Sequence, residues 1–338
     1  MAATAADDSD AVVFEYLPFI RVYRDGRVER LKGTEVVPPS HGVDRATGVA
    51  SKDVLLDPRT GVFARLYLPP LDGTAKLPVL VYFHGGGFCV ETPFSPTFHG
   101  YLNSLAARAR VVAVSVDYRL APEHPLPAAY DDAWEALRWV AAHAGPGGGP
   151  EPWLVEHGDL GRVFVAGDSA GGNIAHNLAM HAGREALDNG VVLEGAVLVH
   201  PFFWGATPVG SEPADPAEHA RAGRMWGFVC PSSAAGFGDP RVDPAAEGAP
   251  GLEGLGCRGV LVCTAGEDKF RARGRRYAEK VRECGGGAPA VEAFETAGEG
   301  HVFHLAMRGT QEEEELMSCL ASFIRGSSSQ GSQQRKPL

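Results

Sequence analysis

Short apolar runs recur along the chain and are separated by longer segments with a different periodicity. Seven of these runs are typical of strands, and they cover residues 62–68, 77–83, 111–116, 163–166, 196–199, 260–263 and 291–294. Between most of them the apolar residues recur at helical spacing, as in residues 130–142. This alternation predicts an α/β fold with a mostly parallel central sheet and helices on both faces.

Two stretches interrupt the alternation of strands and helices. They are residues 1 to about 45 and residues 202 to about 238. A length of 338 residues and a hydrophobic content of 44% suit one large core, so we predict a single domain over residues 1–325. The polar residues 326–338 are predicted to form a disordered tail.

Charge and composition exclude several classes of partner. The formal net charge is −11 and there is no basic stripe, so neither nucleic acid nor an anionic membrane surface is an expected partner. No run of about 18 apolar residues is present, and the first ten residues lack the basic start and apolar stretch of a secretory signal. We therefore expect a cytoplasmic protein with access to the nucleus. The six cysteines have no zinc-ligand spacing, so free thiols and no metal are expected.

A serine flanked by small residues stands where a predicted strand meets a predicted helix. The sequence at 167–171 is Gly-Asp-Ser-Ala-Gly. In a nucleophile elbow the serine sits on a sharp turn close to the backbone, which only small neighbours allow. The turn points the hydroxyl at the helix N-terminus, where free N–H groups and the helix dipole favour negative charge. We predict that Ser169 is a nucleophile.

A serine hydroxyl needs a base, and the base needs a third group that orients it. The strand predicted at 260–263 leads to two carboxylates, of which Asp268 is the preferred orienting acid and Glu267 the alternative. His301 follows a glycine-rich stretch and fits the general base. The order serine, acid, histidine is that of an α/β-hydrolase triad. Three further histidines are interpreted as packing or hydrogen-bonding residues: His176, His200 and His304.

Three glycines directly follow the predicted strand at 77–83. Glycine lets a substrate carbonyl approach the main chain, so that two adjacent N–H groups converge on one oxygen. We expect an oxyanion hole at this loop and at the helix start, with Gly86, Gly87 and Ala170 as backbone donors and with Gly85 and His84 shaping the loop. A phosphate-binding loop is the competing interpretation, but neither G-K-[ST] nor G-x-G-x-x-G is present here.

Three motifs together carry a resemblance to a known family. They are His-Gly-Gly-Gly-Phe at 84–88, Asp-Tyr-Arg-Leu-Ala-Pro-Glu-His-Pro at 117–125 and Gly-Asp-Ser-Ala-Gly-Gly-Asn at 167–173. The chain resembles the hormone-sensitive-lipase-like branch of the α/β-hydrolases, from about residue 12 to about residue 325. Within that branch it is similar to the plant carboxylesterases, a group that also includes the gibberellin receptors and the 2-hydroxyisoflavanone dehydratases.

The resemblance places the family's nucleophile on Ser169, its acid on Asp268 and its base on His301. The receptors of this group have lost the catalytic histidine, so the retained His301 argues against a pure receptor. The resemblance also implies that residues 1–45 and 202–238 form a helical cap over the serine. In the second of these segments we expect apolar residues to wall a substrate pocket or to pack on one another: Phe203, Trp204 and Trp226, together with Met225 and Phe228.

The expected function is that of a carboxylesterase that hydrolyses small carboxylic esters through an acyl-enzyme. Such a serine esterase needs no metal or cofactor, and its partner is the small-molecule ester. We expect a monomer or a homodimer. Two alternatives remain. A receptor would bind a gibberellin-like hormone in the same pocket, and a dehydratase or lyase would use His301 to abstract a proton without an acyl intermediate.

Overall fold

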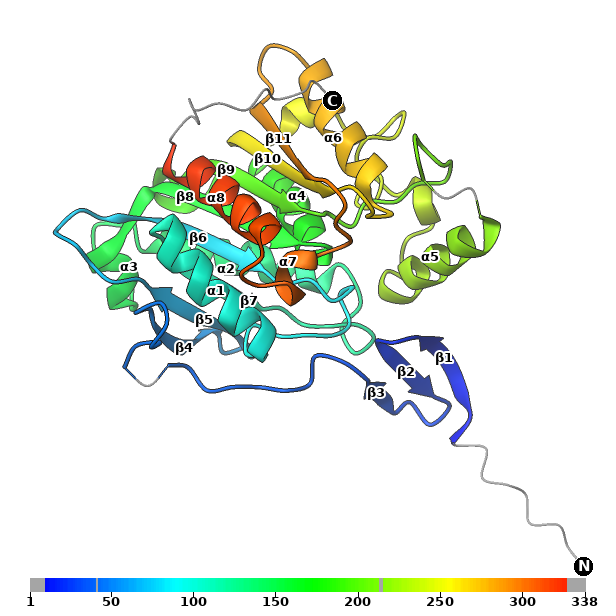
Figure 1. Ribbon diagram of the computed structural model, residues 1–338, viewed down its shortest axis with the longest axis horizontal. Coiled ribbons are helices and arrows are strands. Elements are labelled where there is room, and N and C mark those ends of the chain that lie inside the picture. Colours follow the sequence, from blue (N-terminus) through cyan, green and yellow to red (C-terminus); the bar gives the residue numbers. More distant parts are fainter. Residues whose placement is uncertain (1–9, 41, 213–214, 327–338) are drawn as a thin grey trace, which may run out of the picture.

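The computed structural model describes residues 10–40, 42–212 and 215–326, and an eight-stranded sheet forms its centre (Figure 1). The spatial order of the strands is β11-β10-β9-β8-β6-β7-β5-β4. Their bounds are β4 Ala50–Asp57, β5 Val62–Leu68, β6 Leu77–Phe83, β7 Val112–Asp117, β8 Gly158–Asp168, β9 Leu193–Val199, β10 Cys257–Ala265 and β11 Ala290–Thr296. Of the predicted tail, only Gly326 lies within the described residues.

The sheet is parallel from β11 to β7 and antiparallel at its other edge, where β5 pairs with β7 and β4 pairs with β5. The prediction of a mostly parallel sheet is therefore confirmed. The strand β4 was not predicted from the sequence. It is an edge strand in which buried or half-buried residues alternate with exposed ones, so it lacks the continuous apolar run of the central strands.

Helices cover both faces of the sheet, as predicted (Figure 1). One face carries α1 (Pro96–Ala109), α7 (Phe303–Ala306) and α8 (Gln311–Arg325), and the other carries α2 (Ala128–Ala142), α4 (Ala170–Ala182) and α6 (Arg271–Glu283). The short α3 (Pro152–His157) precedes β8. Residues of β6 alternate between the two cores, because successive side chains of a strand point to opposite faces.

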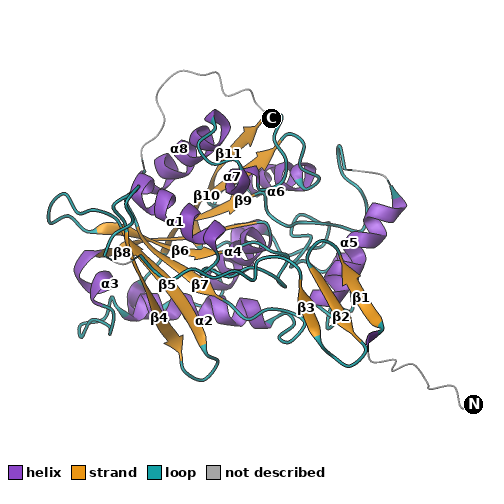
Figure 2. Cartoon of the chain, turned by 60° about the horizontal axis from the view of Figure 1, so that its bottom comes forward, coloured by secondary structure: helices purple, strands orange, loops and turns teal. Residues whose placement is uncertain are grey.

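The N-terminal segment forms a small antiparallel sheet and not the helices expected of it. Its strands are β1 (Val12–Tyr16), β2 (Ile20–Tyr23) and β3 (Val28–Arg30), and they lie beside α5 (Pro216–Val229) of the mid-chain insertion (Figure 2). The prediction of a helical cap is therefore wrong for this segment. Aromatic and β-branched residues favour strands, and Gly26 at φ +87° closes the turn between β2 and β3.

The two interrupting segments contact each other. The Phe14 ring of β1 stacks on the Phe228 ring of α5 with the centroids 3.8 Å apart. The guanidinium of Arg221 donates a hydrogen bond of 2.8 Å to the carbonyl of Leu17 and lies over the Tyr16 ring. In this way two segments that are far apart in the sequence form one structure at the end of the molecule where α5 lies (Figure 2).

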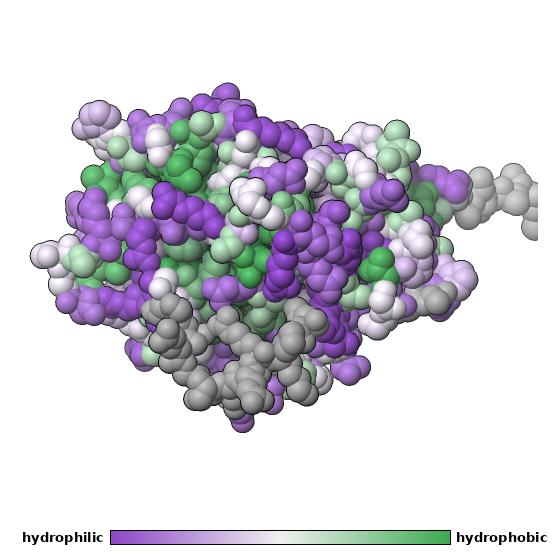
Figure 3. Space-filling view, turned by 90° about the horizontal axis from the view of Figure 1, so that it is seen from above, coloured by the Kyte–Doolittle hydropathy of each residue, from purple (hydrophilic) through white to green (hydrophobic). Residues whose placement is uncertain are grey.

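Hydrophilic residues surround separate hydrophobic areas on the face shown in Figure 3. This mixture is normal for a folded domain, because the polar residues of a chain do not cover its whole surface. Among the described residues, no helix combines the length and the apolar character that crossing a bilayer requires.

Candidate active site

The residues singled out in the sequence lie at the carboxyl edge of the parallel strands. Ser169 follows β8, Asp268 follows β10, and His301 stands in the loop after β11. The glycine loop follows β6. Because β6, β8, β10 and β11 all run in one direction, their carboxyl ends meet on one side of the sheet, where α/β proteins place their sites.

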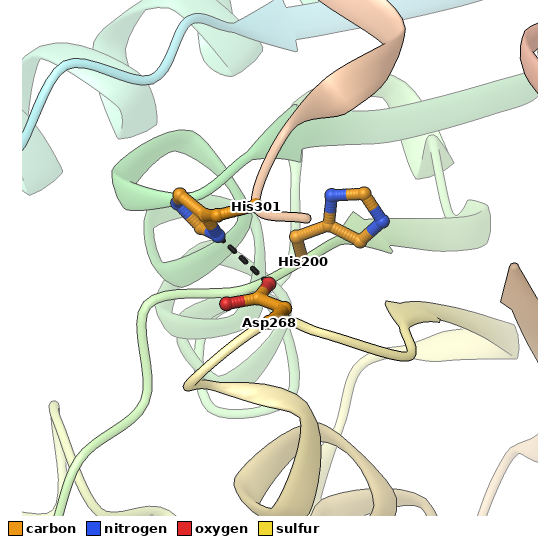
Figure 4. Close-up of side chains that lie close together, drawn as sticks. All are labelled: His200, Asp268 and His301. Atoms are coloured by element: carbon orange, nitrogen blue, oxygen red, sulfur yellow. Dashed lines mark hydrogen bonds and ion pairs between the residues drawn. The ribbon is translucent and has the colours of Figure 1, made fainter. Parts of the chain in front are cut away.

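Two hydrogen bonds connect Asp268, His301 and Ser169. The Oδ2 atom of Asp268 lies 2.8 Å from Nδ1 of His301, as drawn in Figure 4, and Nε2 of His301 lies 2.8 Å from Oγ of Ser169. An ionised carboxylate can only accept, so Nδ1 carries the proton and Nε2 accepts from the serine hydroxyl. The structure thus brings the three residues together. Glu267, the alternative acid, is exposed.

The environment keeps the Asp268 carboxylate charged. Burial raises the pKa of this carboxyl, but the hydrogen bond with His301 and the other favourable interactions of the carboxylate together outweigh burial, and the pKa lies below its usual value. The amide of Phe270 also donates a hydrogen bond of 3.0 Å to its Oδ1 atom. Only 1% of the Asp268 side chain is exposed, compared with 29% of His301. A buried anion therefore fixes the ring, while the ring itself reaches solvent.

The turn at Ser169 has the backbone of a nucleophile elbow. Ser169 adopts φ +50° and ψ −115°, a conformation that side-chain-bearing residues rarely adopt, and it caps α4. A Cβ atom at Gly167 would lie 2.3 Å from the carbonyl carbon of Gly171, and one at Gly171 would lie 1.9 Å from the carbonyl oxygen of Phe83. Only glycine fits at either position, which explains the sequence pattern around the serine.

Replacing Gly171 with alanine is expected to destabilise the protein by about 2–4 kcal/mol, because the new methyl group would collide with the backbone of β6. Urea unfolding measures this loss. The matched control is Gly227→Ala on the exposed side of α5, where nothing lies within 4 Å of the added Cβ. That variant is expected to gain about 0.5–1 kcal/mol from helix propensity. Equal stability of the two variants would contradict the tight contact at Gly171.

The glycine loop after β6 forms part of the wall of the cavity above Ser169. Gly86 and Gly87 both line this cavity, with φ angles of +107° and +61°. The amide of Gly85 is already used, because it donates a hydrogen bond of 3.1 Å to Oδ1 of Asp168. Gly85 therefore supports the loop and donates nothing to the cavity, in keeping with its expected shaping role. Ala170 is the first residue of α4.

Asp168, for which the sequence alone indicated no role, holds this loop against the elbow. Its Oδ1 atom accepts hydrogen bonds from the Tyr82 hydroxyl at 2.6 Å and from the Gly85 amide. Burial raises the pKa of Asp168 to about 6, against the opposing effect of the Tyr82 hydrogen bond. The signal that could have found it is an acidic residue at the end of an apolar strand, since a buried carboxyl requires partners.

His200 supports the backbone beside the candidate base. It is buried, and its Nδ1 accepts a hydrogen bond of 3.0 Å from the Val302 amide. Burial, together with the charge of His301, lowers the pKa of His200 to about 3, so its ring is neutral. The rings of His176 and His304 are also buried.

One ligand atom from each of His200, Asp268 and His301 lies within 4.8 Å of the others, the spacing of a metal site (Figure 4). Asp268 and His301 already satisfy each other as acceptor and donor. Nδ1 of His200 is likewise engaged by the Val302 amide. Because Nδ1 of His200 accepts this hydrogen bond, Nε2 carries the ring proton and cannot bind a metal, although this buried Nε2 has no hydrogen-bond partner among the described residues.

A cavity of about 390 Å³ opens above Ser169. Its apolar wall includes Phe202, Met225 and Phe270. The expected wall residues Phe203, Trp204 and Trp226 do not line it; each is 1% exposed and packs in the core. The prediction of these three as pocket residues is wrong, and the alternative expectation of packing describes them, because the insertion turns the neighbouring positions 202 and 225 toward the serine. Met225, which belonged to the expected apolar set, does line the cavity.

Comparison with known proteins places the chain in a family. Residues 80–305 match the family model described as alpha/beta hydrolase fold. The chain is 44% identical over 327 residues to "2-hydroxyisoflavanone dehydratase" of Glycyrrhiza echinata, covering 96% of this chain and 99% of that protein. It is 46% identical over 326 residues to "Tuliposide A-converting enzyme 2, chloroplastic" of Tulipa gesneriana, covering 96% and 81%. It is 43% identical over 326 residues to "Probable carboxylesterase 13" of Arabidopsis thaliana, covering 93% and 98%.

A solved structure agrees with the same placement. The esterase of Pyrobaculum calidifontis superposes with a TM-score of 0.64 at 31% identity, covering 82% of this chain and 84% of the esterase. The resemblance carried by the three motifs is thereby confirmed. The chain belongs to the α/β-hydrolase fold family and, within it, to the plant carboxylesterases of the hormone-sensitive-lipase-like branch, a class of carboxylic ester hydrolases.

Proposed function

We propose that this protein hydrolyses small carboxylic esters with Ser169 as nucleophile, His301 as general base and acid, and Asp268 as the orienting carboxylate. The observation that carries the proposal is the pair of 2.8 Å hydrogen bonds from Asp268 through His301 to Ser169, whose hydroxyl faces a cavity walled by Gly86 and Gly87. A base within 2.6–3.2 Å of the nucleophile is what proton transfer requires.

In the first step the Ser169 oxygen attacks the ester carbonyl while its proton passes to Nε2 of His301. Asp268 then stabilises the imidazolium that forms. In this proposal the amides of Gly86, Gly87 and Ala170 donate hydrogen bonds to the oxyanion. Donors that are oriented before the charge develops need no rearrangement during the reaction. When the intermediate collapses, His301 gives its proton to the alcohol oxygen and the alcohol leaves.

In the second step water attacks the acyl group on Ser169, and His301 takes a proton from that water. The oxyanion of this second intermediate accepts hydrogen bonds from the same amides. Collapse of this intermediate returns the proton to Oγ of Ser169 and releases the carboxylic acid. The contacts of the site therefore serve both halves of the reaction, and none of the steps requires a cofactor.

Incubation with a fluorophosphonate is expected to add one phosphonyl group to the protein, mapped by peptide mass spectrometry to Ser169. Acid quenching during turnover of a nitrophenyl ester is expected to yield the acyl-enzyme on the same residue. Absence of both adducts, with ligand binding retained, would favour a receptor.

The name of the Glycyrrhiza echinata relative, a dehydratase, supports the alternative. In that reaction His301 would remove a proton from a hydroxylated substrate and Ser169 would form no covalent bond. Turnover of a hydroxylated flavonoid without a trapped acyl group would favour this alternative.

We also propose that the protein is located in the cytoplasm. The tulip relatives have a plastid location in their names, and imaging of a fluorescent fusion distinguishes the two locations.

A further inference from the structure

A lysine ammonium stands in the wall of the otherwise largely apolar cavity. Lys269 directly follows Asp268 and lines the cavity together with Ser169 and His301. Its Nζ lies 5.1 Å from the centre of the Phe270 ring, whose centre lies 4.9 Å from that of the His301 ring. The Phe270 ring therefore interacts with both the Lys269 ammonium and the His301 ring.

None of the hydrogen bonds or ion pairs found among the described residues includes the Lys269 ammonium. The charged groups that act on it are Glu218, Arg221 and Asp268. Glu218 approaches Arg221 at 3.9 Å, and Asp268 is bound to His301. Burial and the charge of Arg221 together lower the pKa of Lys269 more than the two carboxylates raise it. The cation is thus partly desolvated and lacks a counter-charge of its own.

The other charged groups of the cavity do not neutralise Lys269. Glu91 also lines the cavity and its Oε2 atom is buried without a hydrogen-bond partner, but its side chain lies against Gly86 and Gly33 and forms no ion pair with the lysine among the described residues. Lys32 adds a second positive charge on the same cavity, with its Nζ 5.9 Å from the centre of the Phe19 ring. Asp168 is a second carboxyl group of the lining, but the Tyr82 hydroxyl and the Gly85 amide already bind its Oδ1 atom. Lys269, which has no ion pair among the described residues, therefore favours an anionic ligand group, although the lining as a whole carries no excess of positive charge.

We propose that the favoured substrates are esters that carry a carboxylate, bound with that carboxylate against Lys269. This inference rests on the proposed esterase function and adds the substrate class. A charge-assisted hydrogen bond to a partly buried ammonium is stronger than a neutral one. A neutral ester of the same shape leaves the partly desolvated ammonium without a counter-charge, so the lysine discriminates between the two.

Two matched ester pairs test the inference on either side of the scissile bond. The acyl pair is mono-4-nitrophenyl glutarate and 4-nitrophenyl pentanoate, and the alcohol pair is 4-carboxyphenyl acetate and 4-methylphenyl acetate. The readout is the ratio of the two kcat/KM values within each pair. In Lys269→Met the ratio is expected to fall about tenfold in at least one pair, whereas Lys269→Arg should retain most of it. Added salt should reduce the ratio in the native protein.

Lys280→Met is the matched control, because Lys280 lies on α6 near Glu283 and outside the cavity. Its ratios should equal those of the native protein. The inference is overturned if Lys269→Met changes neither ratio, or if Lys280→Met changes them equally. If the native protein hydrolyses none of the four esters, the proposed function fails; binding of the same pairs to Ser169→Ala, measured by calorimetry, then still decides whether Lys269 selects the carboxylate.

Discussion

Ser169→Ala is expected to lower kcat for a short nitrophenyl ester by about 10,000-fold or more, because it removes the atom that attacks the carbonyl. The change deletes one oxygen from a residue that is only 8% exposed, and alanine already occupies the next position in the chain. The fold should therefore persist. Steady-state release of nitrophenol measures the effect, and thermal unfolding checks that the protein remains folded.

Ser318→Ala is the matched control for this change. Ser318 lies on α8 and donates a hydrogen bond to the carbonyl of Glu314, on the face of the sheet opposite α4. Its activity should equal that of the native protein. If Ser169→Ala kept near-normal turnover with a native melting temperature, another group would have to be the nucleophile, and the mechanism proposed here would be abandoned.

The site was largely predictable because a few short motifs define it. The glycines at 167 and 171 are required by contacts below 2.5 Å, and that requirement leaves a pattern in the sequence. The carboxyl ends of β8 and β10 could be placed because each strand has a short apolar run near that end, residues 163–166 and 260–263. Steric contacts and burial thus restrict which residue types can occupy these positions, and that restriction is visible in the sequence.

The pocket wall was not predictable in the same way. Phe202 faces the cavity and Phe203 the core, yet both are aromatic residues of one loop with no periodicity to distinguish them. Which of the two faces the serine depends on how the insertion packs on Phe270 and Tyr277, whose rings lie 5.2 and 5.0 Å from those of Phe202 and Phe203. Tertiary packing decides this, and local sequence carries no record of it.

The role of Lys269 was hidden for a related reason. In the sequence it is one charge beside an exposed glutamate and a buried aspartate, and a solvated surface lysine would look the same. Only the loop between β10 and α6 brings it into the wall of the cavity. A role that depends on the direction in which a loop side chain points can be recognised only from the folded structure.

Asp268→Asn is expected to lower kcat by about 1,000- to 10,000-fold, through the protonation of His301. The Phe270 amide donates to Oδ1 of residue 268, so an asparagine would keep its oxygen there and turn its NH₂ group toward His301. Nδ1 of the ring would then have to accept, and the ring proton would move to Nε2. In that tautomer Nε2 cannot accept the Ser169 proton, and the imidazolium also loses its counter-charge. Nitrophenyl ester kinetics at neutral pH measure the loss.

Glu267→Gln is the control for this prediction, because it removes the neighbouring carboxylate without touching His301. Its side chain is exposed, so the variant should retain native activity. The reverse pattern, an inactive Glu267→Gln beside an active Asp268→Asn, would assign the orienting acid to Glu267. The fluorophosphonate should also label Asp268→Asn more slowly, because the loss lies in the base that activates Ser169, whereas a defect confined to substrate binding would leave the labelling rate unchanged.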